Sequence, residues 1–154
     1  MKKNPVDIFS DWAVSGKDEG MEKNHSKSVD DMLKFSLIKL KNFSFIDAGC
    51  GNGWVVRKVS KNKECENAIG VDGSSKMINK AISLDKKNRY YCSNLLEWMP
   101  KKPVDLVHSM EVFYYFKKPK KIIEHIYKNW IKIRGRLIMG IDFYYENQIS
   151  HGWP

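Results

Sequence analysis

Three glycines at every second position stand between a strand-like and a helix-like segment, in Asp47-Ala48-Gly49-Cys50-Gly51-Asn52-Gly53. A glycine loop at this point of a parallel sheet puts bare backbone N–H groups against a ligand, because no side chain blocks the approach. Asp72 follows Gly49 by 23 residues and ends the next apolar run, where a carboxylate can accept two hydrogen bonds from a ribose diol. Together these features predict a nucleoside-binding site.

The glycine spacing discriminates between nucleoside ligands. The dinucleotide fingerprint G-x-G-x-x-G requires a glycine at position 54, and Trp54 stands there, which disfavours NAD. The spacing D-x-G-x-G-x-G resembles the first motif of class I S-adenosylmethionine-dependent methyltransferases, and the resemblance covers residues 43–145. It implies a three-layer, Rossmann-like α/β fold with a doubly wound sheet of parallel strands in the order 3-2-1-4-5. It also implies S-adenosyl-L-methionine as cofactor and S-adenosyl-L-homocysteine as product.

The resemblance also implies roles for individual residues. In the family an acid after the second strand holds the ribose hydroxyls, a role that falls on Asp72, and a hydrophobic residue after it packs on the adenine, for which Met77 is the candidate. Asn94 replaces the usual acid that accepts from the adenine amino group, and its amide oxygen can still accept that hydrogen bond. The expected cofactor-binding residues are Asp47, Gly49, Cys50, Gly51, Gly53, Asp72, Gly73, Met77, Ser93, Asn94, Leu95 and Ser109.

The expected reaction is an in-line displacement at the methyl group, for which alignment and exclusion of water supply most of the rate. A general base is needed only if the acceptor arrives protonated, and His25 and Glu111 are the candidates. Residues 1–27 resemble the cofactor-covering lid of some family members. We interpret His108 as a strand-end histidine and Cys50 as a small residue tolerated in a tight loop. A substrate wall is an open alternative to core packing for the aromatic residues Phe113, Tyr114, Tyr115, Phe116, Phe143, Tyr144 and Tyr145.

Hydrophobic periodicity indicates alternating strands and helices, which is typical of an α/β fold in one domain. Residues 1–27 read as irregular structure or a short helix, and Ser28 reads as the N-cap of the helix that follows. Strands are expected at 43–48, 68–72, 89–92, 104–109 and 136–143, and helices at 29–40, 54–60, 74–84 and 119–131.

Family members usually continue past the fifth strand with a helix and an antiparallel strand pair, which this sequence lacks. Without them the fifth strand would present a long apolar edge. Three explanations stay open: a C-terminally truncated fragment, a naturally short variant, or a dimer formed across that edge. We favour the fragment, because the residues from Tyr145 onward read as the start of the missing connection.

Composition limits the remaining possibilities. The chain has 154 residues and a formal charge of +9, with 27 basic residues against 18 acidic ones. Only four of the basic residues are arginines, so we read the excess as a solvated lysine surface, although an RNA or acidic partner is possible. The three cysteines lack CxxC spacing, and no metal site is expected. No stretch is long and apolar enough to cross a bilayer, and cytoplasmic localisation is the default.

A small-molecule acceptor is expected. The alternatives are a tRNA or protein acceptor, or a non-catalytic nucleoside-binding or partner-binding module.

Overall fold

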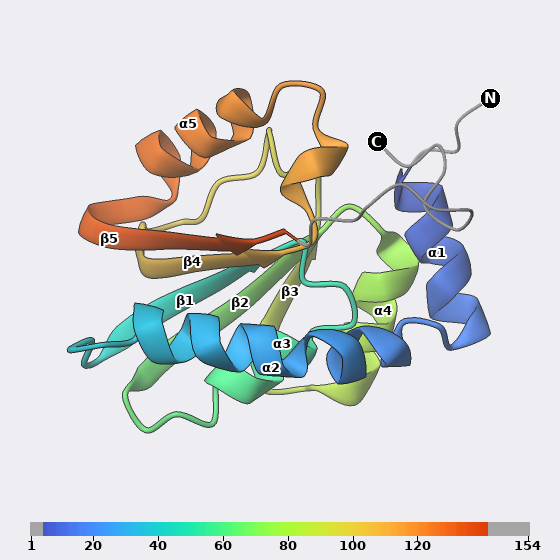
Figure 1. The fold of residues 1–154 in the computed structure, drawn as a ribbon, viewed down its shortest axis with the longest axis horizontal. Coiled ribbons are helices and arrows are strands. Elements are labelled where there is room, and N and C mark those ends of the chain that lie inside the picture. Colours follow the sequence, from blue (N-terminus) through green and yellow to red (C-terminus); the bar gives the residue numbers. More distant parts are fainter. Residues whose placement is uncertain (1–4, 142–154) are drawn as a thin grey trace.

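The computed structural model describes residues 5–141, in which five parallel strands form one sheet in the order β3-β2-β1-β4-β5 (Figure 1). The predicted fold class and strand order are confirmed. The strands are β1 (Phe43–Ala48), β2 (Cys65–Asp72), β3 (Arg89–Cys92), β4 (Val104–Met110) and β5 (Ile131–Gly140). The helices are α1 (Pro5–Ser15), α2 (Glu19–Ser36), α3 (Trp54–Val59), α4 (Ser75–Leu84) and α5 (Pro119–Asn129), with a 3-10 turn, η1 (Phe113–Tyr115).

Helices cover both faces of the sheet, and this explains why the sequence of β1 is apolar almost throughout. Phe43 and Phe45 pack with residues of α2, α3 and α4 on one face, whereas Ile46 and Ala48 pack with residues of α5 and η1 on the other. Because successive side chains of a strand point to opposite faces, a strand covered on both sides has no polar face. Figure 1 shows α5 on one side of the sheet and α2 with α3 on the other.

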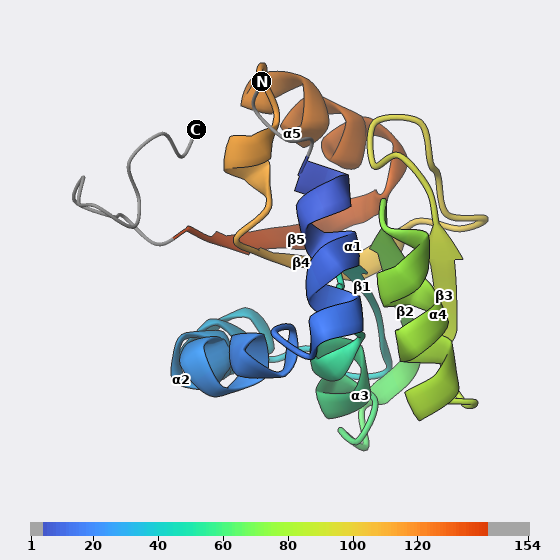
Figure 2. The same ribbon diagram turned by 90° about the vertical axis from the view of Figure 1, so that its right-hand side faces the viewer.

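The first helical pair differs from the prediction. Helix α2 begins at Glu19, ten residues before the predicted start, and Ser28 lies inside it, exposed, so its prediction as an N-cap is wrong. His25, Val29 and Leu33 are buried at four-residue spacing, so the buried stripe simply continues toward the N-terminus among charged neighbours. Helix α1 crosses the carboxyl edge of the strands beside α4, as Figure 2 shows.

Other boundaries moved because strand pairing overrides local periodicity. Strand β2 starts at Cys65, and β5 starts at Ile131, which the periodicity had assigned to the preceding helix. Apolar periodicity places Ile82 on the inner side of α4 and Tyr127 on the inner side of α5, but these residues are 41% and 75% exposed. Phe143 lies outside the described residues. Within residues 5–141, no helix combines the length and apolar character needed to cross a membrane.

Candidate functional site

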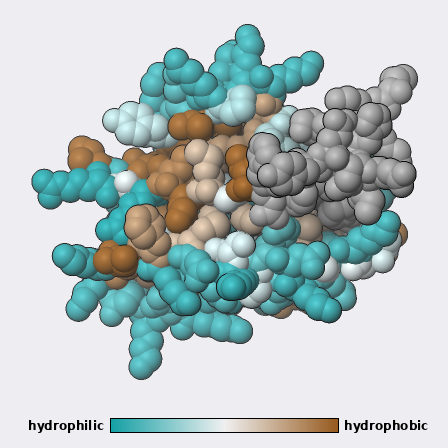
Figure 3. Space-filling view, in the orientation of Figure 1, coloured by the Kyte–Doolittle hydropathy of each residue, from teal (hydrophilic) through white to brown (hydrophobic). Residues whose placement is uncertain are grey.

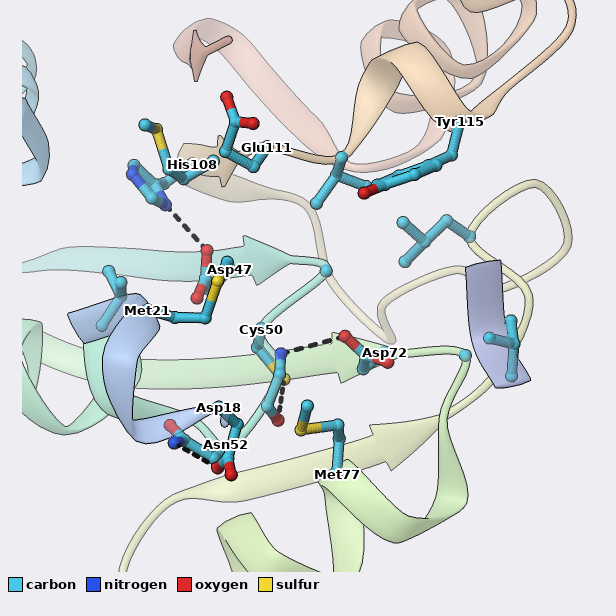
Figure 4. Close-up of a pocket in the computed structure, with 18 of the residues that line it drawn as sticks. Asp18, Met21, Asp47, Cys50, Asn52, Asp72, Met77, His108, Glu111 and Tyr115 are labelled. Atoms are coloured by element: carbon cyan, nitrogen blue, oxygen red, sulfur yellow. Dashed lines mark hydrogen bonds and ion pairs between the residues drawn. The ribbon is translucent and has the colours of Figure 1, made fainter. Parts of the chain in front are cut away.

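A cavity of about 440 Å³ opens at the carboxyl edge of the sheet. The ends of β1, β2 and β4 contribute to its wall, together with residues of α1 and α2. In Figure 4, Cys50 and Asp72 lie near each other, and Glu111 and Tyr115 lie above them in the view. The predicted site residues that line the cavity are His25, Asp47, Gly49, Cys50, Gly51, Asp72, Gly73, Met77, Ser93, Asn94, Leu95 and Glu111.

Two predicted cofactor-binding residues do not line the cavity. Gly53 has φ +79, and a Cβ there would lie 2.5 Å from the ring of Tyr90, so this glycine makes room for a core side chain. The hydroxyl of Ser109 donates to the carbonyl oxygen of Ala48 at 2.7 Å and is buried. Both residues therefore pack next to the site without facing the cavity.

The glycine loop is not bare in the way the sequence suggested. The N–H groups of Gly49 and Cys50 both donate to the carbonyl oxygen of Val71, at 2.8 and 3.1 Å. The Gly53 N–H donates to the Cys50 carbonyl at 2.9 Å, and the Gly51 N–H donates to the Asp72 carboxylate at 2.9 Å. The prediction of unused N–H donors at these positions is therefore wrong, because the strand ends and the loop itself take them. The loop instead provides clearance, since a Cβ on Gly51 would meet no protein atom within 4 Å.

Asp72 holds the loop and keeps capacity for a ligand. Its carboxylate accepts from the N–H of Gly51 at 2.9 Å and from the N–H of Ser74 at 2.8 Å, through different oxygens. Each oxygen retains a second lone pair, which suits a diol. Burial raises the pKa of Asp72, and these backbone hydrogen bonds oppose that rise.

Asn94 is exposed and already engaged. Its side-chain oxygen accepts from the Leu96 N–H at 3.0 Å, and its amide nitrogen donates to Glu97 at 3.0 Å. These contacts orient the amide, and the oxygen keeps one lone pair for a further donor.

The thiol of Cys50 is not activated. Burial raises its pKa well above the ordinary value, and the nearby carboxylates of Asp72 and Asp47 raise it further. A neutral buried thiol is a poor nucleophile, which agrees with its interpretation as a small loop residue.

A buried Asp47–His108 pair forms the floor of the cavity. The two residues are register partners on β1 and β4, and His108 Nδ1 lies 2.7 Å from Asp47 Oδ1. His108 has no solvent exposure, and its Nε2 has no hydrogen-bond partner among the described residues. The sequence interpretation missed this pairing. Its signal was two polar residues placed toward the ends of adjacent, largely apolar strands.

Asp18 also belongs to the site, although no sequence motif indicated it. It is 2% exposed, and its carboxylate accepts from the side chains of Asn52 at 2.8 Å and Lys80 at 2.9 Å. The hydrogen bond to Asp18 is the main cause that raises the pKa of Lys80. Asp18 thus ties the turn between α1 and α2 to the glycine loop, so that Met21 and His25 line the cavity.

The end of β4 carries a network of buried oxygens. Glu111 is 5% exposed, and the hydroxyl of Tyr114 lies 2.9 Å from its Oε2 and 3.1 Å from the hydroxyl of Tyr115. Burial raises the pKa of both tyrosines. Tyr115 and Phe116 line the cavity, whereas Phe113 is 2% exposed in the core, so the aromatic run divides between wall and core. Residues 143–145 lie outside the described residues.

The sequence and the structure of this chain are similar to those of known methyltransferases. A malonyl-[acyl-carrier protein] O-methyltransferase from Halalkalibacterium halodurans is 26% identical over 113 residues. The match covers 67% of this chain and 41% of that relative, so the chain spans less than half the relative's length.

Among solved structures, a complex of the Haloferax volcanii Trm112 methyltransferase activator with a methyltransferase matches with 28% identity and a TM-score of 0.76. That match covers 99% of this chain and 67% of the other. The N-methyltransferase NodS from Bradyrhizobium japonicum, in complex with S-adenosyl-L-homocysteine, shares the fold at 19% identity and a TM-score of 0.63, over 77% of this chain and 60% of the other.

A family model described as a methyltransferase domain matches residues 20–139, which include the glycine loop, all but the first residue of α2 and all but the last residue of the sheet. The N-terminal helix α1 precedes the match. This chain therefore belongs to the methyltransferase domain family.

Proposed function

We propose that this chain binds S-adenosyl-L-methionine in the cavity and transfers its methyl group to an acceptor by in-line displacement. The observation that carries the proposal is the open face of Gly51 in a cavity that is also lined by Asp72, at the end of β2, and by Glu111, after the end of β4. In open α/β sheets, ligands bind at this edge, where the strand order reverses. The family match supports the same activity.

The residues present fit this cofactor. A cavity of about 440 Å³ is within the usual range for small ligands. Asp72 has the acceptor capacity for a ribose diol, and Met77 offers an apolar side chain for a base. With Nδ1 donating to Asp47, the buried Nε2 of His108 is an unused acceptor in the wall, which suits a cationic amino group.

When bound, the cofactor supplies a methyl group already activated by the sulfonium. The chain has to align the acceptor, exclude water and, for a protonated acceptor, take up a proton. His25 and Glu111 both line the cavity and are largely buried, at 8% and 5% exposure, and they remain our base candidates. Residues 1–27 act as the lid in this proposal, with Asp18 as its anchor.

We propose a small molecule as acceptor, since the α1–α2 segment partly encloses the cavity. The alternatives are a tRNA or protein acceptor, and a module that binds the cofactor without transferring its methyl group. The Haloferax volcanii structure contains an activator protein, which makes a protein partner a further proposal for this chain. Cytoplasmic localisation stays a prediction.

Titration calorimetry with S-adenosylmethionine, S-adenosylhomocysteine and NAD tests the proposed cofactor. We expect the two sulfur ligands to bind and NAD not to bind. Asp72→Ala removes charge-assisted hydrogen bonds and should weaken binding by about 2–3 kcal/mol. The control Asp105→Ala removes a carboxylate near the amino-terminal ends of the strands, away from the cavity, where it contacts Ser44 and Lys132. This control should leave affinity unchanged.

Equal affinity of the Asp72→Ala and unmodified chains would remove Asp72 from the site, provided that circular dichroism shows both folded. Incubation with labelled donor and separate metabolite and tRNA pools then distinguishes the acceptor classes. Cofactor binding without any label transfer would favour the binding-only module.

A further inference from the structure

The charge of the cavity is opposite to that of the chain. Four carboxylates line it, from Asp18, Asp47, Asp72 and Glu111, and no lysine or arginine does so among the described residues. The chain as a whole carries +9, yet among the described residues the acids line the cavity and the lysines do not.

Three of these carboxylates hold neighbouring elements in place. Asp18 contacts Lys80 and Asn52, Asp47 contacts His108, and Asp72 accepts backbone N–H groups. Glu111 differs in its position, because it follows β4 and lies across the cavity from Asp72, with its carboxylate accepting from the Tyr114 hydroxyl. This position puts the Glu111 carboxylate on the side of the cavity opposite the proposed ribose-binding group.

The backbone at Glu111 is strained. Its φ is +58, and the other non-glycine residues with positive φ in residues 5–141, namely Lys39, Asn42 and Arg134, are all exposed. Left-handed backbone is unfavourable for a glutamate, and such strain concentrates at functional sites. Two contacts maintain it: the Glu111 N–H donates to the Gly140 carbonyl at 2.9 Å, and the Tyr114 hydroxyl holds the carboxylate. The fold thus fixes a carboxylate against the cavity at a conformational cost.

We propose that the methyl acceptor is a primary or secondary amine, and that Glu111 binds its nitrogen and takes its proton. This inference rests on the proposed function. The ammonium form of the acceptor gives a proton to the Glu111 carboxylate, which leaves a lone pair on nitrogen. That lone pair attacks the methyl carbon, the N–C bond forms as the S–C bond breaks, and the electron pair of the S–C bond goes to sulfur. The products are the methylated ammonium and S-adenosylhomocysteine.

Electrostatics favours this class over an anionic acceptor. The acceptor enters as an ammonium, and the fixed Glu111 carboxylate stabilises that positive charge until it takes the proton. A carboxylate or phosphate acceptor would instead stand beside Glu111 in a cavity whose described lining has no lysine or arginine, where two like charges repel.

Matched acceptor pairs test the proposal on the full chain. Phenethylamine is compared with 3-phenylpropionate, and butylamine with butyrate. Binding is followed by ligand-detected NMR with saturating S-adenosylhomocysteine, and methyl transfer by mass spectrometry with S-adenosylmethionine. We expect at least one amine to bind and to be methylated at least tenfold faster than its carboxylate partner.

Variants assign the effect to Glu111. Glu111→Gln should lower amine methylation at least 100-fold while cofactor affinity changes less than threefold. Glu124→Gln, a half-exposed carboxylate on α5, is the matched control and should leave the rate unchanged. Tyr114→Phe removes the hydroxyl that holds the carboxylate and should lower kcat about tenfold with a smaller change in KM. Glu111→Asn serves as a second variant, because asparagine tolerates positive φ if the glutamine variant fails to fold.

The outcomes separate the two proposals. Failure of S-adenosylmethionine to bind overturns the proposed function itself. If the cofactor binds, three results would overturn the amine proposal alone. These are a preference for the carboxylates, no binding of either acceptor class, and full amine methylation by both Glu111 variants.

Discussion

Gly51 and Gly53 carry the same signal in the sequence and do different work in the structure. Both have positive φ, at +52 and +79. A Cβ at position 51 would meet open space in the cavity, whereas one at position 53 would collide with the ring of Tyr90, whose nearest atoms lie 2.5–2.9 Å away. One glycine therefore serves ligand access and the other serves core packing.

Alanine substitutions should separate these two roles. Positive φ costs alanine about 1–2 kcal/mol at either position. Gly53→Ala also overpacks the core against Tyr90, and we expect it to lose about 1–3 kcal/mol more unfolding free energy than Gly51→Ala. Urea denaturation measures the difference. Gly51→Val should keep the fold and abolish cofactor binding, and equal destabilisation by the two alanine variants would contradict this division.

At the scale of elements, a carboxylate fixes the connection from α4 to β3. Asp85 follows α4 and accepts from the Tyr90 hydroxyl at 2.7 Å, the Asn88 side chain at 2.6 Å and the Lys87 N–H at 2.8 Å. Partial burial raises the pKa of Asp85, but the hydrogen bonds outweigh it and lower the pKa to about 2. The same tyrosine ring packs beside Gly53 and Gly70, so this connection also supports the glycine loop.

Acid should therefore weaken the α4–β3 connection. A carboxyl whose folded-state pKa is depressed stabilises the fold above its ordinary pKa, and this contribution is lost as pH falls through the folded-state value. For Asp85 the window runs from about pH 4 to about pH 2.

Thermal melts of the unmodified chain and Asp85→Asn test this window. The melting temperature of the unmodified chain should exceed that of Asp85→Asn at pH 5, and this difference should shrink between pH 4 and pH 2. The control Asp31→Asn changes an exposed carboxylate on α2 and should show no such window. A pH-independent difference between the Asp85 pair would contradict the linkage.

At the scale of the whole molecule, the outer edge of β5 is open within residues 5–141. No described strand pairs with it, and Ile133, Met139 and Ile141 near it are 96%, 41% and 50% exposed. Figure 3 shows hydrophobic residues gathered between hydrophilic surfaces in this region. An exposed apolar edge is a template for pairing with another strand.

The open edge predicts self-association of the 154-residue chain. Sedimentation velocity should show a monomer–dimer equilibrium, and Ile133→Lys should raise the dimer Kd about tenfold or more by placing a charge on the edge. Leu84→Lys, at an exposed apolar residue of α4, is the control and should leave the equilibrium unchanged. A chain that stays monomeric at all concentrations would contradict the prediction.

Local patterns predicted most elements well. The bounds of β1 and β3 agree with the structure, and α4 is preceded by Ser74 as a true N-cap, whose hydroxyl accepts from the Met77 N–H at 3.3 Å. The largest errors lie at α2 and β5. In α2 a buried stripe continues among charged residues, and in β5 pairing with β4 extends the strand back to Ile131. Neither effect leaves a clear local signal.

The sequence by itself determined the family, the order of the elements and the position of the glycine loop next to Asp72, because those features depend on residues close together in the chain and on apolar periodicity. Only the tertiary structure decided which groups are available to a ligand. Asp47 and His108 meet across 61 residues, and Asp18 and Asn52 across 34. The loop N–H groups are taken by Val71, Cys50 and Asp72. Hydrogen-bond partners of this kind depend on how strands pair and helices pack, which no local pattern specifies.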